Sequence, residues 1–191
     1  MKIPGMELYY KYTLSDEGGV YKKSRRCIAN SFLTGYHALF FAKLGLAKVA
    51  EQDTGNTSRN WNGYASTIVG PAGNVNYGIV VGTGTNAVDV TDYALQTRIA
   101  HGSGGGQLQY SATTVAAPTF VGSTAELIFT RLFTNASGST VTIEELGVYY
   151  YASIDASISV SNYLCGIRDV ATVAITNGTT LTLNYIIQTT V

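Results

Sequence analysis

Six short segments rich in β-branched and aromatic residues follow one another along the second half of the chain. Clusters of Gly, Asn and Ser separate them, and no helical pattern interrupts the series. Short strands at this spacing are typical of antiparallel sandwiches and jelly rolls. We therefore predict a mainly β protein in which residues 77–191 form an antiparallel β-sandwich or jelly-roll-like domain. The six segments are residues 78–81, 107–115, 126–134, 141–151, 163–170 and 180–189.

The first 50 residues differ from the rest of the chain in charge. They hold eight basic and three acidic side chains, whereas the chain as a whole is neutral. Their net charge of +5 is therefore balanced by −5 in the remaining residues. Opposite charges on two parts of a chain favour contact between them, within one subunit or between copies. We expect residues 1–50 to dock the β domain to a neighbour, and a solvated basic arm is the alternative.

Apolar side chains recur at helical spacing between Ser24 and Gly45. Ser24 is a suitable N-terminal cap, and Gly45 is a suitable residue for ending a helix. The pattern therefore predicts one amphipathic helix after an N-terminal arm. The apolar residues that this helix would use for assembly are Ile28, Phe32, Tyr36, Phe40 and Leu44.

Residues 51–76 are dense in Asn, Gly, Ser and Thr, which predicts a long polar loop. A loop of this length in a compact domain is usually functional or supported by a partner. It contains Trp61, the only tryptophan, and Tyr64. Trp61 is either a core residue or, with Tyr64, an exposed anchor for a partner or a sugar ring.

The segment after residues 78–81 contains Gly82, Gly84 and Ala87, which fit the G-x-G-x-x-A spacing of a dinucleotide-binding turn. Such a turn needs a helix directly after it, whose N-terminus faces the pyrophosphate. Here β-branched residues alternate with polar ones instead, and no acidic residue stands about 20 positions further on. We therefore expect a glycine bend between strands and no nucleotide cofactor.

No other spacing in the chain predicts catalysis or metal binding. His37 and His101 lack the spacing to Cys or carboxylate residues that metal sites show. Cys27 and Cys165 are expected to be reduced thiols in a protein made in the cytoplasm. Because the chain has no apolar run of transmembrane length and no basic total charge, neither a membrane nor nucleic acid is expected as a partner.

Asp89 and Asp92 lie close enough in the sequence to share a cation through loop oxygens. A cap on the turn that follows is the favoured role of Asp92. The sequence leaves open whether the two carboxylates hold an ion.

A hairpin through residues 134–140 is the predicted connection between two of the strands. Glu144 and Glu145 are adjacent in the second strand, so they face opposite sides of a sheet and do not form a catalytic pair. The hairpin would place Arg131 opposite one of these glutamates. We therefore expect Arg131 to form a cross-strand ion pair with Glu144 or Glu145 that helps to fix the register.

Several of these segments resemble structural proteins of tailed bacteriophages. The resemblance is carried, in order, by residues 77–111, 129–149, 167–170 and 177–187. The helical pattern of residues 24–44 is similar to the segment that often precedes them. The likeness spans most of the chain, from residue 24 to residue 191.

The resemblance implies a virion component, such as a tail, tail-tip, fibre-like or capsid-decoration protein, that is made in the host cytoplasm and built into the virion. It also implies a β-sandwich that assembles with copies of itself and with other virion proteins, and it supplies no catalytic residue. We therefore expect a non-enzymatic structural protein. A carbohydrate- or receptor-binding module for a host-surface glycan is the alternative, and a hydrolase with an acidic pair in a cleft is a third class.

Overall fold

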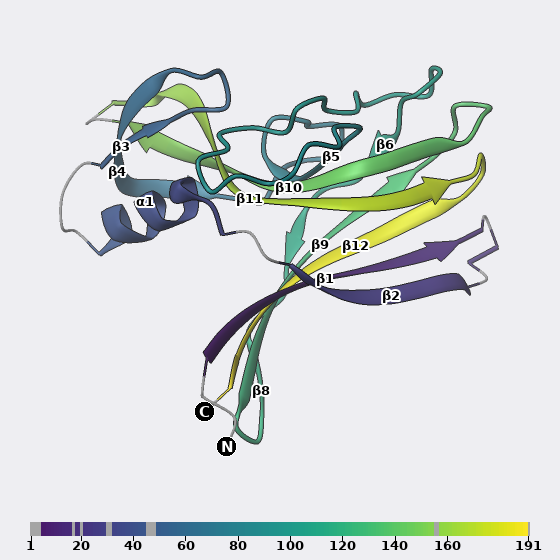
Figure 1. Ribbon diagram of the computed structural model, residues 1–191, viewed down its shortest axis with the longest axis horizontal. Helices are drawn as coiled ribbons and strands as arrows, with labels where there is room; N and C mark the ends of the chain where they lie inside the picture. The colour runs from purple at the N-terminus through teal and green to yellow at the C-terminus, as the bar shows by residue number, and fades with distance from the viewer. Residues whose placement is uncertain are drawn as a thin grey trace.

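A computed structural model of the protein describes residues 5–16, 18–19, 21–29, 32–44, 49–154 and 157–190. Its description leaves out the side chains of residues 21–24, 62–65, 153 and 157–161. Two antiparallel sheets pack together, and one helix lies at an end of the smaller sheet (Figure 1). The predicted mainly β, antiparallel sandwich is therefore confirmed.

Sheet A contains the first two strands and the last strand of the chain. Its order is β2 (Tyr21–Ala29), β1 (Gly5–Ser15), β12 (Thr180–Thr190), β9 (Thr124–Thr134) and β6 (Gln109–Tyr110), with β7 (Thr114–Val115) and β8 (Thr119–Val121) also paired to β9. β1 pairs with β12 along its whole length, from Gly5 opposite Thr190 to Ser15 opposite Thr180. The predicted N-terminal arm is therefore wrong for these residues, because β1 lies inside the sheet, between β2 and β12.

Sheet B is built mainly on one long hairpin. Its order is β11 (Ser157–Ile175), β10 (Val141–Ile154), β4 (Ser58–Thr67) and β3 (Val49–Gln52), with β5 (Gly78–Gly82) also paired to β10. β3 and β4 overlap residues 51–76, the segment predicted to be a polar loop, so that prediction is wrong for 51–52 and 58–67. The sandwich thus draws strands from all three predicted regions, 1–50, 51–76 and 77–191.

The hydrophobic core lies between the two sheets. Alternate residues of β12 point into it, so that Leu181, Leu183 and Tyr185 are fully buried. Leu146 and Val148 of β10 are fully buried in the same core. The apolar residues at alternate positions 181, 183 and 185 are thus the ones that face the core.

Helix α1 (Thr34–Lys43) is shorter than predicted and begins ten residues later than Ser24. The earlier residues belong to β2, where they pair with β1 and so satisfy their backbone groups in the sheet. The buried face of the helix packs towards β3, β4 and β11. That face consists of Gly35, Ala38, Leu39 and Ala42.

β1, β12, β9 and β8 continue beyond the sandwich as a narrow twisted projection of sheet A (Figure 1). We call residues 5–8, 119–127 and 187–190 the extension. The register across it places Met6 opposite Thr189, Thr189 opposite Ala125, and Ala125 opposite Phe120. Because opposite residues point to the same face, these four side chains form one row across the extension.

Candidate functional site

The glycine-rich turn after β5 closes around the carboxylate of Glu145, which is fully buried. The backbone N–H groups of Gly84 and Thr97 donate hydrogen bonds to Glu145 Oε1 at 3.0 and 2.8 Å. The backbone N–H of Gln96 donates to Oε2 at 3.0 Å. Glu145 thus anchors both ends of the segment from residue 83 to residue 97 to strand β10.

The two glycines are required by this close approach. A Cβ atom on Gly82 would lie 2.5 Å from both Glu145 Oε1 and the carbonyl oxygen of Thr97. A Cβ on Gly84 would lie 2.6 Å from Glu145 Oε1 and from the Cβ of Gln96. The turn therefore holds an anion with backbone N–H groups, as a phosphate-binding turn does, but this anion is a side chain of the same protein.

Arg168 of β11 completes the cluster as a buried counter-ion. Its Nε donates to Glu145 Oε2 at 3.2 Å, and its Nη1 donates to Asp92 Oδ2 at 2.7 Å. Its Nη2 also donates to the carbonyl oxygen of Asn86 at 3.1 Å. Burial alone would lower the pKa of Arg168, but the bonds to Asp92 and Glu145 raise it above its ordinary value. Arg168 therefore links Glu145 of strand β10 to the loop that contains Asn86 and Asp92.

Asp89 and Asp92 are used within the loop and its ion pair. Asp92 Oδ2 accepts the backbone N–H of Asp89 at 2.8 Å in addition to the Arg168 bond. Asp89 Oδ1 accepts the backbone N–H and the hydroxyl of Thr91, and these bonds lower the pKa of Asp89. Asp92 thus caps a turn that precedes it, and not the turn after it that the sequence favoured.

An apolar cluster seals the same loop onto the outer face of sheet B. It consists of Leu33, Val80, Leu95, Tyr149 and Cys165. The backbone N–H of Leu95 donates to the hydroxyl of Tyr149 at 2.5 Å. Because Glu145 and Arg168 lie beneath this closed layer, they act as structural charges and face no open cleft.

The predicted ion pair between Arg131 and Glu144 or Glu145 is wrong. Arg131 lies opposite Leu183 in sheet A, while both glutamates lie on β10 in sheet B. Residues 134–140 therefore connect the two sheets and do not form a hairpin within one. Glu145 binds Arg168, and Glu144 Oε2 accepts the hydroxyl of Thr172 at 2.6 Å.

Arg131 instead points into the core and is fully buried. Its guanidinium donates to five backbone carbonyl oxygens, of residues 71, 74, 77, 79 and 111, at distances from 2.6 to 3.4 Å. It also stacks over the ring of Tyr110, with 4.8 Å between the guanidinium carbon and the ring centroid. Burial lowers the pKa of Arg131 to about 10, so the side chain remains charged at neutral pH.

Trp61 is a core residue, which settles the alternatives that the sequence left open at this position. Its ring is fully buried, and its Nε1 donates to the carbonyl oxygen of Glu51 at 3.1 Å. A buried ring has no face for a sugar or a partner. The side chain of Tyr64 lies outside the described residues, so the predicted ligand-binding pair has no described surface.

The residues predicted for an assembly helix lie on three different elements. Ile28 belongs to β2, where its side chain is exposed, so its assignment to the helix is wrong. Phe32 forms a single β-bridge with Ile167 before the helix begins. Tyr36 and Phe40 lie on α1 with their rings stacked at 6.5 Å, and Leu44 is its exposed C-terminal cap.

The histidines and cysteines take ordinary structural roles. His101 Nδ1 accepts the backbone N–H of Tyr110 at 3.0 Å, and His37 Nδ1 lies 3.0 Å from the carbonyl oxygen of Leu33. Cys27 and Cys165 are free thiols. Within the part of the chain that the structure describes, no group of three or more His, Cys, Asp or Glu side chains could hold a metal ion.

Sequence reasoning missed the most exposed apolar residues of the described chain. Phe120 and Val121 lie at the tip of the β8–β9 hairpin, where they are 77% and 78% exposed. The sequence did contain a signal for this hairpin tip, because Gly122 follows directly and glycine favours tight turns. In the structure Gly122 adopts the positive φ of such a turn. The structural role of Arg168 was also not predicted, because Asp169 is the only charged residue next to it in the sequence and no pattern of charges indicates a buried ion pair.

Comparisons with known proteins supply no further constraint. No protein-family model, curated protein or solved structure matches the chain. Among the described residues, no helix has the length and hydropathy that crossing a membrane requires.

Proposed function

We propose that the protein is a non-enzymatic structural subunit, a β-sandwich building block that assembles with copies of itself and with other proteins of a phage virion. The observation that carries this proposal is the uncovered inner face of the extension. Along the sandwich, this face of sheet A packs on sheet B. In the extension it carries Met6 and Phe120, which are 54% and 77% exposed.

The extension continues the hydrophobic core into solvent. Leu127 and Ile187 lie opposite each other in the row next to Met6 and Phe120, and both pack against the core cluster. An apolar strip thus runs from the sandwich to the end of the extension. The equivalent strip of a second copy has the matching chemistry to cover it. Burial of such surface contributes about 25 cal/mol per Å², before the cost of association.

Helix α1 presents a second exposed apolar surface. Phe40 and Leu44 are each 57% exposed, and Phe41 is 44% exposed. Exposed apolar residues that are grouped on one element favour a protein contact. Two such surfaces on separate elements suit a subunit that contacts more than one neighbour.

The virion setting rests on the resemblance of residues 24–191 to structural proteins of tailed bacteriophages. Low charge supports the same proposal, since charged residues make up 13% of the chain against about 25% in average soluble proteins. A carbohydrate- or receptor-binding role centred on Trp61 has lost its support, because that ring is buried.

The proposal is tested by the mass of the purified protein in solution, measured by light scattering over a range of concentrations. We expect an oligomer whose mass falls in Phe120→Ser. Val90→Ser is the matched control, because Val90 is also an exposed apolar residue, at 57%, but lies in the loop that covers sheet B. A wild-type monomer, or an equal effect of the two substitutions, would overturn the docking role of the extension.

Point substitutions are preferable to removal of the N-terminal residues. β1 lies between β2 and β12, so its deletion would break the ladders on both of its sides. A truncated chain that fails to assemble could simply have failed to fold. Phe120 lies at a hairpin tip, so its substitution leaves the packing of the sandwich unchanged.

A further inference from the structure

We propose that the outer face of sheet A holds a binding groove for an acidic oligosaccharide of two or three sugar units. This groove is distinct from the inner face of the extension and does not depend on the assembly proposed above. It has a volume of about 570 Å³ and crosses β2, β1, β12 and β9. Ligand pockets for small molecules have volumes of roughly 300–1,000 Å³.

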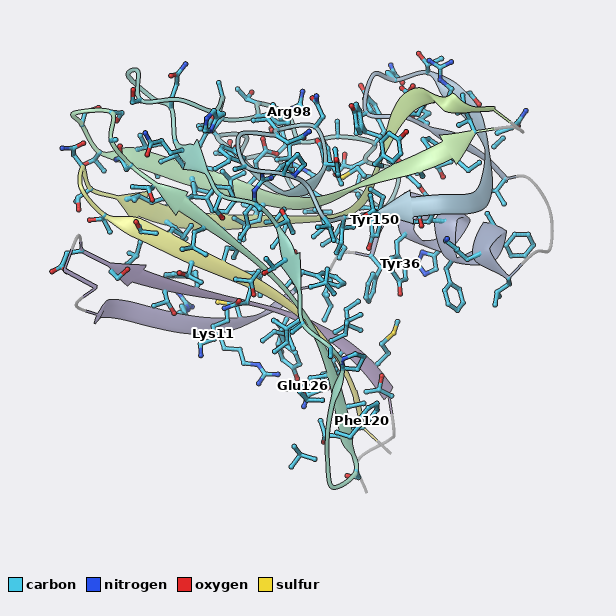
Figure 2. All side chains as sticks on the ribbon, turned by 180° about the vertical axis from the view of Figure 1, so that it is seen from behind. Lys11, Tyr36, Arg98, Phe120, Glu126 and Tyr150 are labelled. Atoms are coloured by element: carbon cyan, nitrogen blue, oxygen red, sulfur yellow. The ribbon has the colours of Figure 1, made fainter. Side chains whose placement is uncertain are left out.

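The charge of the groove favours an anionic ligand. Its cationic side chains are Lys11 and Arg26, which lie opposite each other on β1 and β2, and Glu126 is the one carboxylate among its described lining residues. Lys11 is exposed and makes no ion pair with any carboxylate that the structure describes, whereas Arg25 lies opposite the buried Tyr12 and so belongs to the other face of the sheet. One unpaired cation, Lys11, is therefore available to a bound carboxylate, and Figure 2 shows Lys11 and Glu126 on the outer side of the sheet.

Arg26 has a different role, as a fixed wall. Its guanidinium lies over the ring of Tyr9, with 4.0 Å between the guanidinium carbon and the ring centroid. Its Nη2 donates to Gln188 Oε1 at 2.8 Å and lies 3.7 Å from Glu126 Oε1. These contacts join β2 to three other strands, β1, β12 and β9, and hold Arg26 in place, so that it closes one side of the groove.

The floor offers both hydrogen-bonding groups and apolar surface. Asn184 and Thr130 lie opposite each other on β12 and β9, and the Thr130 hydroxyl donates to Asn184 Oδ1 at 2.6 Å. This leaves the Asn184 amide nitrogen without an acceptor among the described residues. Ile186 and Ile128 form the adjacent row. Polar groups beside an aliphatic strip match a sugar, which presents hydroxyls at its edge and C–H groups on its face.

Other anionic partners fit the groove less well. An extended peptide would find no backbone partners here, because the groove lies on the face of the sheet and the ladders of β1, β12 and β9 use the backbone groups. A nucleic acid would find no stacking surface, since none of the described residues that line the groove is aromatic. The ligand must therefore be recognised by the side chains that line the groove, which is how a sugar would be bound.

The test is isothermal titration of the full chain with trigalacturonate and with sialyllactose. The matched neutral probes are the methyl ester of trigalacturonate and lactose. We expect binding of the acidic sugars and no detectable binding of the neutral ones at the same concentrations. Lys11→Gln should weaken the binding roughly two- to five-fold, and Lys11→Glu roughly ten-fold. Lys43→Gln, an exposed cation on α1, is the control and should leave the affinity unchanged.

Three results would overturn the proposal. They are no binding of either acidic sugar, binding that Lys43→Gln weakens as much as the groove variants do, and equal binding of inorganic polyphosphate. The last would show a groove that responds to charge alone. If the groove is instead covered by a second copy, Lys11→Glu would lower the mass in light scattering and the sugars would not bind. Phe120→Ser should leave sugar binding unchanged, so the two proposals fail separately.

Discussion

The backbone N–H of Gly84 donates a hydrogen bond of 3.0 Å to the buried carboxylate of Glu145, 61 residues further along the chain. With Thr97 and Gln96 this bond closes the glycine-rich turn around an anion supplied by the protein. The same carboxylate binds Arg168, which reaches on to Asp92. A segment that resembles a cofactor-binding turn in its spacing is therefore an internal lock between a loop and two strands.

Glu145→Gln should lower the stability of the fold, because it keeps the shape of the side chain and removes its charge. Arg168 would then keep Asp92 as its only charged partner, and the substituted amide would place an N–H group among N–H donors. Loss of one member of a buried pair costs about 3–5 kcal/mol. Urea unfolding measures the change. Glu144→Gln is the control and should cost less than about 1 kcal/mol, because Glu144 is half-buried and accepts one hydroxyl bond. Equal effects at the two positions would contradict the lock.

Gly84→Ala should destabilise the protein by about 1–3 kcal/mol through overpacking. Its Cβ would lie 2.6 Å from both Glu145 Oε1 and the Cβ of Gln96, so the loop must move away from the carboxylate. Gly105→Ala is the matched control, since a Cβ there meets no atom within 4 Å. Thermal unfolding of both variants checks the difference. If Gly84→Ala melts with the wild type, the close approach of the turn to Glu145 is not required.

Arg131→Met should unfold the region around β5 and β9 more than any surface substitution does. It fills much of the same volume but leaves five carbonyl oxygens without their donor. Unpaired buried groups cost about 1–3 kcal/mol each where water does not replace the donor, so we expect a loss of at least about 3 kcal/mol. Arg25→Met is the control, because Arg25 is an exposed arginine on β2. Hydrogen exchange of residues 70–79 should rise in Arg131→Met alone, and unchanged exchange there would refute this role.

Stability should fall steeply above pH 10. Burial is the largest cause that raises the pKa of five tyrosines that are buried in the fold, Tyr10, Tyr110, Tyr149, Tyr150 and Tyr185. In the unfolded chain these groups lose their protons near pH 10, so their contribution is complete below pH 10 and is lost as the pH rises. Arg131 opposes this with one proton, because its pKa is lowered to about 10 from 12.5. The net effect of about four protons corresponds to about 5 kcal/mol per pH unit.

The alkaline transition is followed by tyrosinate absorbance and by circular dichroism on the same sample. We expect the buried tyrosines to ionise only as the β signal is lost. Ionisation of all 14 tyrosines near pH 10 with the β signal intact would contradict their burial in the native state.

The local pattern of the sequence determined the fold class and several strands. Residues 180–189 were predicted as a strand, and the apolar residues at alternate positions of it face the core, since a pleated strand points alternate side chains to one face. The same pattern cannot name a partner strand, because any strand with an apolar face is compatible with it. For this reason residues 126–134 and 141–151 were paired by proximity in sequence, whereas the structure places them in different sheets. The basic N-terminal segment was predicted to be an arm because its place inside sheet A depends on pairing with β12, which lies about 170 residues further along the chain.

Long-range contacts decided the candidate site as well. Spacing and context were enough to predict that Gly82 and Gly84 form a bend, because the helix that a nucleotide turn needs is missing. The anion in that bend could not be predicted, since Glu145 and Arg168 approach it through pairing of β5, β10 and β11. Arg131 illustrates the same limit, because a charged residue in an alternating strand is expected to face outward. Only the tertiary structure supplies the five carbonyl oxygens that make its burial favourable.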